Sequence, residues 1–442
     1  GADALDANNA NNNTAVGYAA MGANTTGSGN VAVGFNALDA NTTANNNTAL
    51  GSSALTSNTT GTENTAVGGH ASSSTTTGDN NTSVGYTALY TNTTGANNVA
   101  VGRAALYTNN GSANVAIGQK ALYTNSTGAN NTAVGHQSLQ ANTTGGLNAA
   151  LGREALLKNT TGSQNTACGA YTLYENLSGI ENTAVGYVAL EKNTGSYNTA
   201  VGSRSLDVNT TGTSNVALGY QSLTSNTTAN NNTALGYGAM AANTTGANNT
   251  AVGYGALDAN TTANANTAVG YNALTNNTTG TENAAFGAYA LQENLGSYNS
   301  AFGDQCLDAN TTGTRGTAVG NNALTANTTG NYNTAVGDAA LASNTTSDDN
   351  VAMGRQALTS SATGSDNVAI GNYALYTANG ASDNTAVGKS ALYANTTADK
   401  NTAVGRNALA SNTTGEWNTA VGAYALDANT DGQTNSALGY GA

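Results

Sequence analysis

The sequence contains no proline, and charged residues make up only 8% of its 442 residues, against roughly a quarter in ordinary soluble domains. The absence of proline excludes proline-rich linkers, and it suits a sheet in which every backbone amide is a donor. Only 11 Lys and Arg occur, which excludes the basic patch that a nucleic acid needs. No stretch reaches the roughly 18 apolar residues of a membrane span. We therefore expect no nucleic-acid partner and no membrane insertion in this segment.

The composition is biased, with 55 Gly and an excess of Asn, Thr and Ala, yet 38% of the residues are hydrophobic and regularly placed. Disordered chains combine high charge with few apolar residues, so the pattern favours an ordered structure. The chain begins at Gly1 and ends at Ala442, both inside a repeat unit, and we expect it to be a portion of a longer chain.

One short motif, Asn-Thr-Ala-Val-Gly, recurs from Gly17 to Gly439 with a spacing of 17 residues, or 16 in three units. We number this Gly as position 0 and count the other positions from it. A fixed period this short is typical of a solenoid in which each repeat forms one coil. The expected fold is an all-β, parallel β-solenoid or β-roll of about 26 coils, forming a single continuous domain over residues 1–442.

Within each unit, positions −3 to −1 have the β-branched character of a strand. The Gly at position 0 permits a sharp bend or a close approach of backbone; the first such bends are at Gly17, Gly34, Gly51, Gly68, Gly85 and Gly102. A second short extended piece is expected over +1 to +4. The motif Asn-Thr-Thr-Gly at +7 to +10 is typical of a turn, and all three 16-residue units lose their residue there.

Position −4 is Asn in every unit except one, where Gly316 replaces it. Stacked coils would bring these side chains into register, so their amides are expected to form a hydrogen-bonded ladder along the solenoid. The alternative is that Asn only starts the strand after a turn. The ladder is favoured because a turn position would also accept Asp or Ser. Its first members are Asn13, Asn30, Asn47, Asn64, Asn81 and Asn98.

Position −2 is Ala in every unit but one, while −1 is always apolar. Since neighbouring strand residues face opposite ways, Val at −1 is expected to fill the coil and Ala at −2 to face outward. The opposite orientation stays open, and both leave an outward apolar column that indicates packing against another chain, for which a threefold axis is the expected arrangement. A third alternative is a thin coil with room only for Ala inside. The proposed interface residues are Ala15, Ala32, Ala49, Ala66 and Ala100.

The residues that support catalysis are scarce and scattered. His70 and His136 are the only histidines, and both lie in variable columns. Cys168 and Cys306 occupy apolar columns without a partner at metal-binding spacing, so they are expected to be buried thiols and not a disulfide. Acidic residues occur mostly singly. The sequence therefore predicts no enzyme, no cofactor and no metal site.

Two outward features are candidates for binding. Tyrosines gather at +1 and +5, and Tyr220, Tyr237, Tyr254 and Tyr271 in successive units form a stripe that would suit a sugar or a partner fibre. The alternative, which is favoured, is ring stacking that stiffens the solenoid. The adjacent threonines at +8 and +9 do not share one strand face, which argues against an ice-binding array there.

The unit "NTAVGYGALDANTTANAN" at residues 249–266 resembles repeats of phage tail-fibre-like and bacterial surface proteins. The stretches "NVAVG" at 98–102 and "NVAIG" at 114–118 are similar to the head repeats of trimeric autotransporter adhesins. This resemblance implies a β-roll that assembles as a homotrimer on a cell or virion surface. We expect an extracellular structural or adhesive fibre shaft that associates with itself, and a surface receptor or glycan is a further candidate partner. The alternative is an ice-binding or glycan-binding solenoid.

Overall fold

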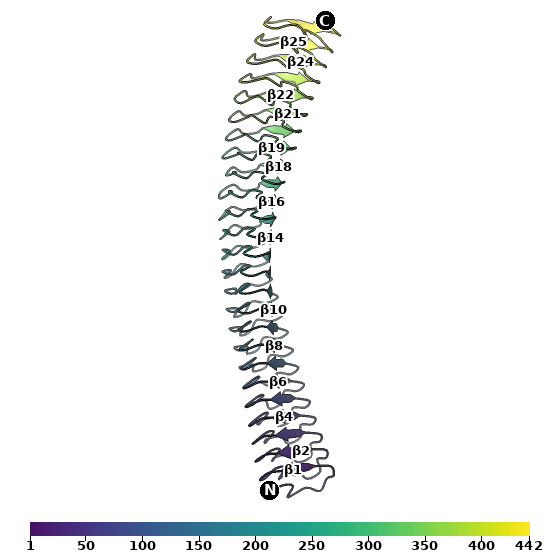
Figure 1. Ribbon diagram of the computed structural model, residues 1–442, viewed down its shortest axis with the longest axis vertical. Coiled ribbons are helices and arrows are strands. Elements are labelled where there is room, and N and C mark those ends of the chain that lie inside the picture. The colour runs from purple at the N-terminus through teal and green to yellow at the C-terminus, as the bar shows by residue number, and fades with distance from the viewer. The chain divides into compact units, whose positions relative to one another are not determined.

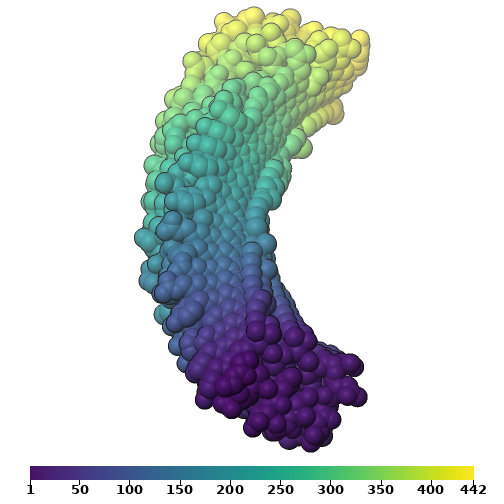
Figure 2. Space-filling view, turned by 60° about the horizontal axis from the view of Figure 1, so that its bottom comes forward, coloured from purple at the N-terminus to yellow at the C-terminus, as the bar shows by residue number.

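The computed structural model describes residues 1–442, which divide into two compact units. Unit 1 comprises Gly1–Gln221 with Asn226–Thr228, and unit 2 comprises Ser222–Ser225 with Ala229–Ala442. Both are built from the same coil, and in the space-filling view successive coils of a unit lie directly against one another (Figure 2). That the chain forms one continuous domain remains a prediction.

Each coil contributes one three-residue strand at positions −3 to −1, and the chain contains no helix (Figure 1). The strands of unit 1 are β1 (Thr14–Val16), β2 (Val31–Val33), β3 (Thr48–Leu50), β4 (Thr65–Val67), β5 (Thr82–Val84), β6 (Val99–Val101), β7 (Val115–Ile117), β8 (Thr132–Val134), β9 (Ala149–Leu151), β10 (Thr166–Cys168), β11 (Thr183–Val185), β12 (Thr199–Val201) and β13 (Val216–Leu218). Those of unit 2 are β14 (Thr233–Leu235), β15 (Thr250–Val252), β16 (Thr267–Val269), β17 (Ala284–Phe286), β18 (Ser300–Phe302), β19 (Thr317–Val319), β20 (Thr334–Val336), β21 (Val351–Met353), β22 (Val368–Ile370), β23 (Thr385–Val387), β24 (Thr402–Val404), β25 (Thr419–Val421) and β26 (Ser436–Leu438).

Within each unit the strands pair in parallel with identical positions side by side. Ala15 of β1 lies beside Ala32 of β2. Ala184 of β11 likewise lies beside Ala200 of β12, although the repeat that connects these two strands is one residue shorter than the others. This arrangement confirms the expected all-β parallel solenoid and its 17-residue repeat. No element is a helix of the length and apolarity needed to cross a bilayer.

The glycine at position 0 ends every strand at a bend, as the sequence predicts. At Gly152 the backbone φ is +137°, which L side chains rarely adopt. A Cβ atom there would also lie 2.5 Å from the carbonyl oxygen of Gly169 in the next coil. Conformation and close packing therefore both require Gly in this column.

The segment from +1 to +4 is a turn, and the expected second extended piece is wrong. Two of its residues are left-handed in nearly every coil, for example Asn36 with φ 52° and Leu38 with φ 54°. This conformation costs about 1–2 kcal/mol for an L-residue. Full burial of a Leu side chain contributes about 1.5–3 kcal/mol, and Leu38 is fully buried. Burial therefore offsets the strained backbone.

The interior of the coil is filled by Ala at −2, a small residue at +3 and Leu at +4, as in the cluster of Ala32, Ala37 and Leu38. The expected outward Ala column is thus wrong. Ala32, Ala49, Ala66 and Ala100 are fully buried within a single chain, and Ala15 of the first strand packs against the same core. Because Leu at +4 occupies most of the interior, only a methyl group fits at −2. The thin-coil alternative accounts for this column.

The Asn-Thr-Thr-Gly turn is confirmed. The Asn58 side chain donates from Nδ2 to the carbonyl of Gly61 at 2.9 Å, which closes the turn. In one of the 16-residue repeats, Asn109 donates at 2.8 Å to the carbonyl of Gly111, which lies two residues further along the chain and not three. The deletion is therefore absorbed inside the turn, and the rest of the coil keeps its register.

Candidate functional site

The expected ladder of Asn at −4 is present and lies inside the coil. Asn131 is fully buried, and its side chain makes four hydrogen bonds. Its Nδ2 donates to the Gly145 carbonyl of its own coil at 2.9 Å and to Asn114 Oδ1 at 3.2 Å. Its Oδ1 accepts from the backbone N and the Nδ2 of Asn148 in the next coil. The Asn131 side chain therefore closes its own coil and joins the coils on both sides.

A second buried ladder runs through the Asn at +7, which sequence reasoning assigned only to the turn. Asn142 donates to Asn125 Oδ1 at 2.7 Å and to the same Gly145 carbonyl at 2.9 Å. The two Asn columns thus converge on one carbonyl in each coil. The near-constancy of Asn at +7 was the available signal, but turn chemistry explained it equally well.

The threonine at +8 forms a third series of contacts between coils. Thr143 donates from Oγ1 to the carbonyl of Thr160 at 2.9 Å, and Thr160 donates likewise to Leu177 at 2.8 Å. These hydroxyls are used within the protein. They are therefore not an array free to order water, in agreement with the sequence argument against an ice-binding array at this site.

We expect Gly316→Asn to stabilise unit 2, because Gly316 is the one gap in the −4 ladder. The new Oδ1 would accept a hydrogen bond from the Asn333 backbone amide, as Asn131 Oδ1 does from Asn148. The new Nδ2 would donate to the Gly330 carbonyl, which already accepts from Asn327. Two buried hydrogen bonds contribute about 1–3 kcal/mol together. The measurement is the denaturant midpoint of unfolding. A lower midpoint than that of the natural chain would contradict the expectation and point to crowding by Leu307, whose Cδ1 lies 3.3 Å from the added Cβ.

The outer face of the sheet carries the side chains at −3 and −1. The −1 side chains are apolar in every strand and partly exposed, for example Ile117 at 41%, Leu151 at 44% and Met353 at 42%. Sixteen strands begin with Thr and six with Val, and no charged residue occupies either position. We call this surface of each unit the strand face. Its −1 column is a continuous apolar strip along each unit, beside a −3 column that is mostly Thr, and such a strip marks a candidate interaction surface.

The tyrosine columns stack between coils. In unit 2, the rings of Tyr237 and Tyr254 are 5.2 Å apart at 7°, and those of Tyr254 and Tyr271 are 5.4 Å apart at 13°. Tyr220, the fourth member of the predicted stripe, belongs to unit 1. Each ring of a stack covers a face of its neighbour, so the stripe presents mainly edges and hydroxyl groups. The geometry favours the stiffening role, and recognition by this stripe stays a prediction.

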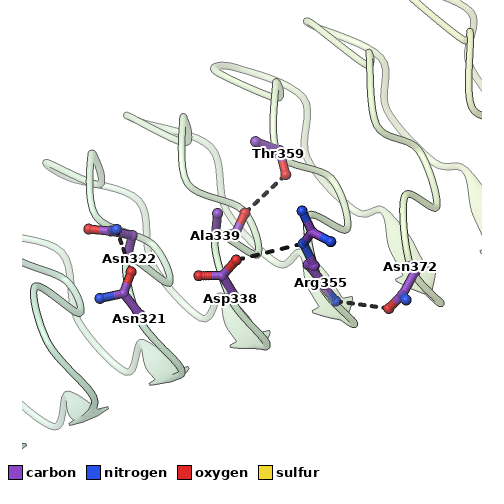
Figure 3. Close-up of polar contacts among 7 residues, drawn as sticks. All are labelled: Asn321, Asn322, Asp338, Ala339, Arg355, Thr359 and Asn372. Carbon is purple, nitrogen blue, oxygen red and sulfur yellow. Dashed lines mark hydrogen bonds and ion pairs between the residues drawn. The ribbon is translucent and has the colours of Figure 1, made fainter.

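The column at +1 also carries polar and charged residues, and four successive ones are Asn321, Asp338, Arg355 and Asn372 (Figure 3). Arg355 Nε lies 3.9 Å from Asp338 Oδ2, and the Arg355 backbone amide donates to Asn372 Oδ1 at 3.2 Å. Both charged side chains are more than half exposed, so this pair contributes little to stability. The surface beyond the bend is therefore variable and solvated.

Carboxylates at +5 are partly buried, and burial raises the pKa of Asp207, Asp258 and Asp308. Burial also raises the pKa of Glu191, and the nearby Asp207 raises it further. Such shifts accompany catalytic carboxylates but also occur in structural ones. No group of three or more His, Cys, Asp or Glu residues is arranged to hold a metal ion.

The two cysteines differ in environment, which corrects the expectation that both are buried. Cys306 is buried at +3, donates to the Gly320 carbonyl at 2.6 Å and has its pKa raised by burial. Cys168 is exposed at the end of β10 on the strand face, because −1 points outward. Both are free thiols.

No protein-family profile matches the chain, and no curated protein is similar to it.

Proposed function

We propose that the chain is a non-catalytic segment of an extracellular fibre shaft on a cell or virion surface. Three copies pack side by side through their strand faces. The observation that carries this proposal is the strand face itself, which is uncharged in all 26 strands and apolar at every −1 position. The resemblance to surface-fibre repeats supports the location and the number of copies.

The volumes of the outward residues support a packed partner. Only four strands begin with a residue other than Thr or Val, and they begin with Ala149, Ala284, Ser300 and Ser436. The same strands end in Leu151, Phe286, Phe302 and Leu438, all larger than the usual Val. A small −3 residue is thus always accompanied by a large −1 residue, although six other strands with Leu, Ile or Met at −1 keep Thr or Val at −3. A close-packed interface limits the summed volume, whereas a solvated surface does not.

The energy of covering the strand face is comparable with the cost of association. Full burial of such a side chain contributes about 1.5–3 kcal/mol, so covering the exposed part of the more exposed −1 residues contributes at most about 0.6–1.2 kcal/mol per coil. Ten such coils would contribute up to about 6–12 kcal/mol, which lies within the range of association costs of about 4–15 kcal/mol. Each unit contains 13 strands.

We expect light scattering to give three times the 43.5 kDa mass of one chain. The triple variant Val134→Glu, Val185→Glu, Val201→Glu places three charges on the strand face and should yield single chains. A matched control, Ala23→Glu, Ala141→Glu, Val208→Glu, adds the same charge at +6, where Glu175 occurs naturally, and should leave the mass unchanged. A single-chain mass for the unmodified protein at micromolar concentration would refute self-association, and a twofold mass would refute the trimer alone.

Cross-linking through Cys168 tests whether the packed chains run parallel or antiparallel. If copies run parallel and in register, the exposed Cys168 thiols meet at the same level, and a short bismaleimide should link two chains. The buried Cys306 serves as the internal control, and Cys168→Ser should abolish the link. Antiparallel copies matched end to end would instead place Cys168 of strand β10 near Phe286 of strand β17, and no link would form.

A second candidate is an ice-binding solenoid, favoured by the threonines that begin sixteen strands on the strand face. The bulky Phe286 and Phe302, which stack at 4.9 Å and are 36% and 42% exposed, interrupt the flatness that such a surface needs. Inhibition of ice recrystallisation at micromolar concentration, lost in the Val→Glu triple variant, would favour this candidate over the shaft.

A further inference from the structure

The tyrosine stack at +5 in unit 2 ends abruptly at Tyr393. Its ring stacks on Tyr376 of the preceding coil at 5.3 Å and 7°, and the ring of Tyr373 lies 6.4 Å from it at an angle of 66°. The following coil has Ala410 at the same position. The second face of the Tyr393 ring therefore has no ring against it, and Tyr393 remains 39% exposed.

An open hollow of about 470 Å³ lies at this position, lined by Ser390, Tyr393, Ala394, Asn407, Ala410 and Ser411. Three of these residues are polar, and none is charged. The backbone amides of Ser390, Asn407 and Ser411 donate within the coil-to-coil ladder, whereas their side chains make no hydrogen bond inside the chain. Two hydroxyls and one amide are therefore available around an aromatic ring.

We propose that this hollow binds one ring of a neutral saccharide. The axial C–H groups of a pyranose would lie on the open face of Tyr393, since the ring offers an apolar surface held rigid by Tyr376 and Tyr373. The hydroxyl groups of the sugar would bond to Asn407, Ser390 and Ser411. The volume falls in the range of small-molecule sites. The absence of a charged lining residue favours a neutral ligand over an acidic one.

The site is independent of the proposed assembly. Its residues lie at +2, +5 and +6, beyond the glycine bend, whereas the strand face carries −3 and −1. It also differs from the Tyr237–Tyr254–Tyr271 stripe, where stacking occupies the ring faces. The other uninterrupted +5 stack, Tyr90–Tyr107–Tyr123, is followed by the larger Gln140 and not by Ala.

The test uses saturation-transfer NMR on the full chain with glucose, galactose, mannose and N-acetylglucosamine, and with sialic acid and phenol as charged and aromatic probes. At least one neutral sugar should receive saturation. Ala410→Tyr should weaken its binding at least tenfold, because it extends the stack over the open ring as Tyr107 does at 5.1 Å from Tyr90. Because Tyr already occurs at +5 in other coils, the variant should fold.

Ala342→Tyr is the matched control, since it makes the same change at +5 between Thr325 and Thr359, where no tyrosine stack ends; it should leave binding unchanged. Tyr393→Phe keeps the ring face and should retain binding within about threefold. The proposal is overturned if no neutral sugar binds, if only sialic acid or phenol binds, or if Ala410→Tyr and Ala342→Tyr weaken binding equally.

Discussion

Gly236→Ala is expected to destabilise the coils around it by about 2–6 kcal/mol. The residue has φ +137°, and an added Cβ would lie 2.7 Å from the Gly253 carbonyl carbon, with the carbonyl oxygen closer still. A strained backbone costs about 1–3 kcal/mol, and forced overpacking costs a similar amount. The structure cannot relieve the strain or the overpacking by a small side-chain movement, because the obstructing atoms belong to the backbone of the next coil.

The same coil provides the control. Gly238 also has a positive φ, +62°, but a Cβ there would meet nothing within 4 Å. Alanine already occupies this position in other coils, as at Ala104 with φ 57°. Gly238→Ala should therefore change stability by about 1 kcal/mol or less, because the left-handed penalty is partly offset by the reduced freedom of the unfolded chain.

The measurement is native-state hydrogen exchange, because stability in a solenoid is set largely by contacts between neighbouring coils. The Gly253 amide, which donates to the Leu235 carbonyl at 2.8 Å, reports on the affected coil. Its opening free energy should fall in Gly236→Ala and remain nearly unchanged in Gly238→Ala. Equal effects of the two variants would show that close approach between coils does not set the requirement for Gly.

The sequence was sufficient to predict the coil, its strand and its bend, since one conformation recurs in every unit. Gly17 and Asn13 are nearly invariant in their columns, and each has a physical reason to be so. The direction of the strand was not predictable in the same way. Alternation places Ala15 and Val16 on opposite faces but does not say which face is inside. Leu38 decides this by filling the coil interior.

The left-handed Leu at +4 had no sequence signal. Positions that require a positive φ usually carry Gly or Asn, yet Leu38 and Leu55 adopt φ of 54° and 50°. Burial alone explains why this position is nearly always Leu, so the sequence gives no sign that its backbone is left-handed.

The buried pair Ser72 and Ser83 was also not predictable. Their hydroxyls form a hydrogen bond of 2.8 Å, but in the sequence they look like two unrelated substitutions. Only the coil brings +4 and −2 together.

Asn131→Asp is expected to destabilise unit 1 by about 3–5 kcal/mol at pH 7, and by much less in acid. The carboxylate keeps the acceptor for Asn148 but places its second oxygen against the Gly145 carbonyl and Asn114 Oδ1, which both require a donor. A buried charge without a donor is strongly unfavourable. Protonation restores one donor, so the folded state should raise the pKa of this carboxyl group above its unfolded value of about 3.9.

The sign of the pH dependence follows from that shift. Below pH 3.9 the carboxyl group is protonated in both states, and the loss of stability relative to the natural chain is smallest. The loss grows by about 1.36 kcal/mol per pH unit as pH rises, and levels off above the raised folded pKa. Denaturant midpoints of variant and natural chain, compared from pH 3 to pH 7, measure it. Asn131→Leu, which cannot ionise, should lose about 2–4 kcal/mol at every pH. A pH-independent difference for Asn131→Asp would show that the −4 side chain is not the buried donor that closes the coil.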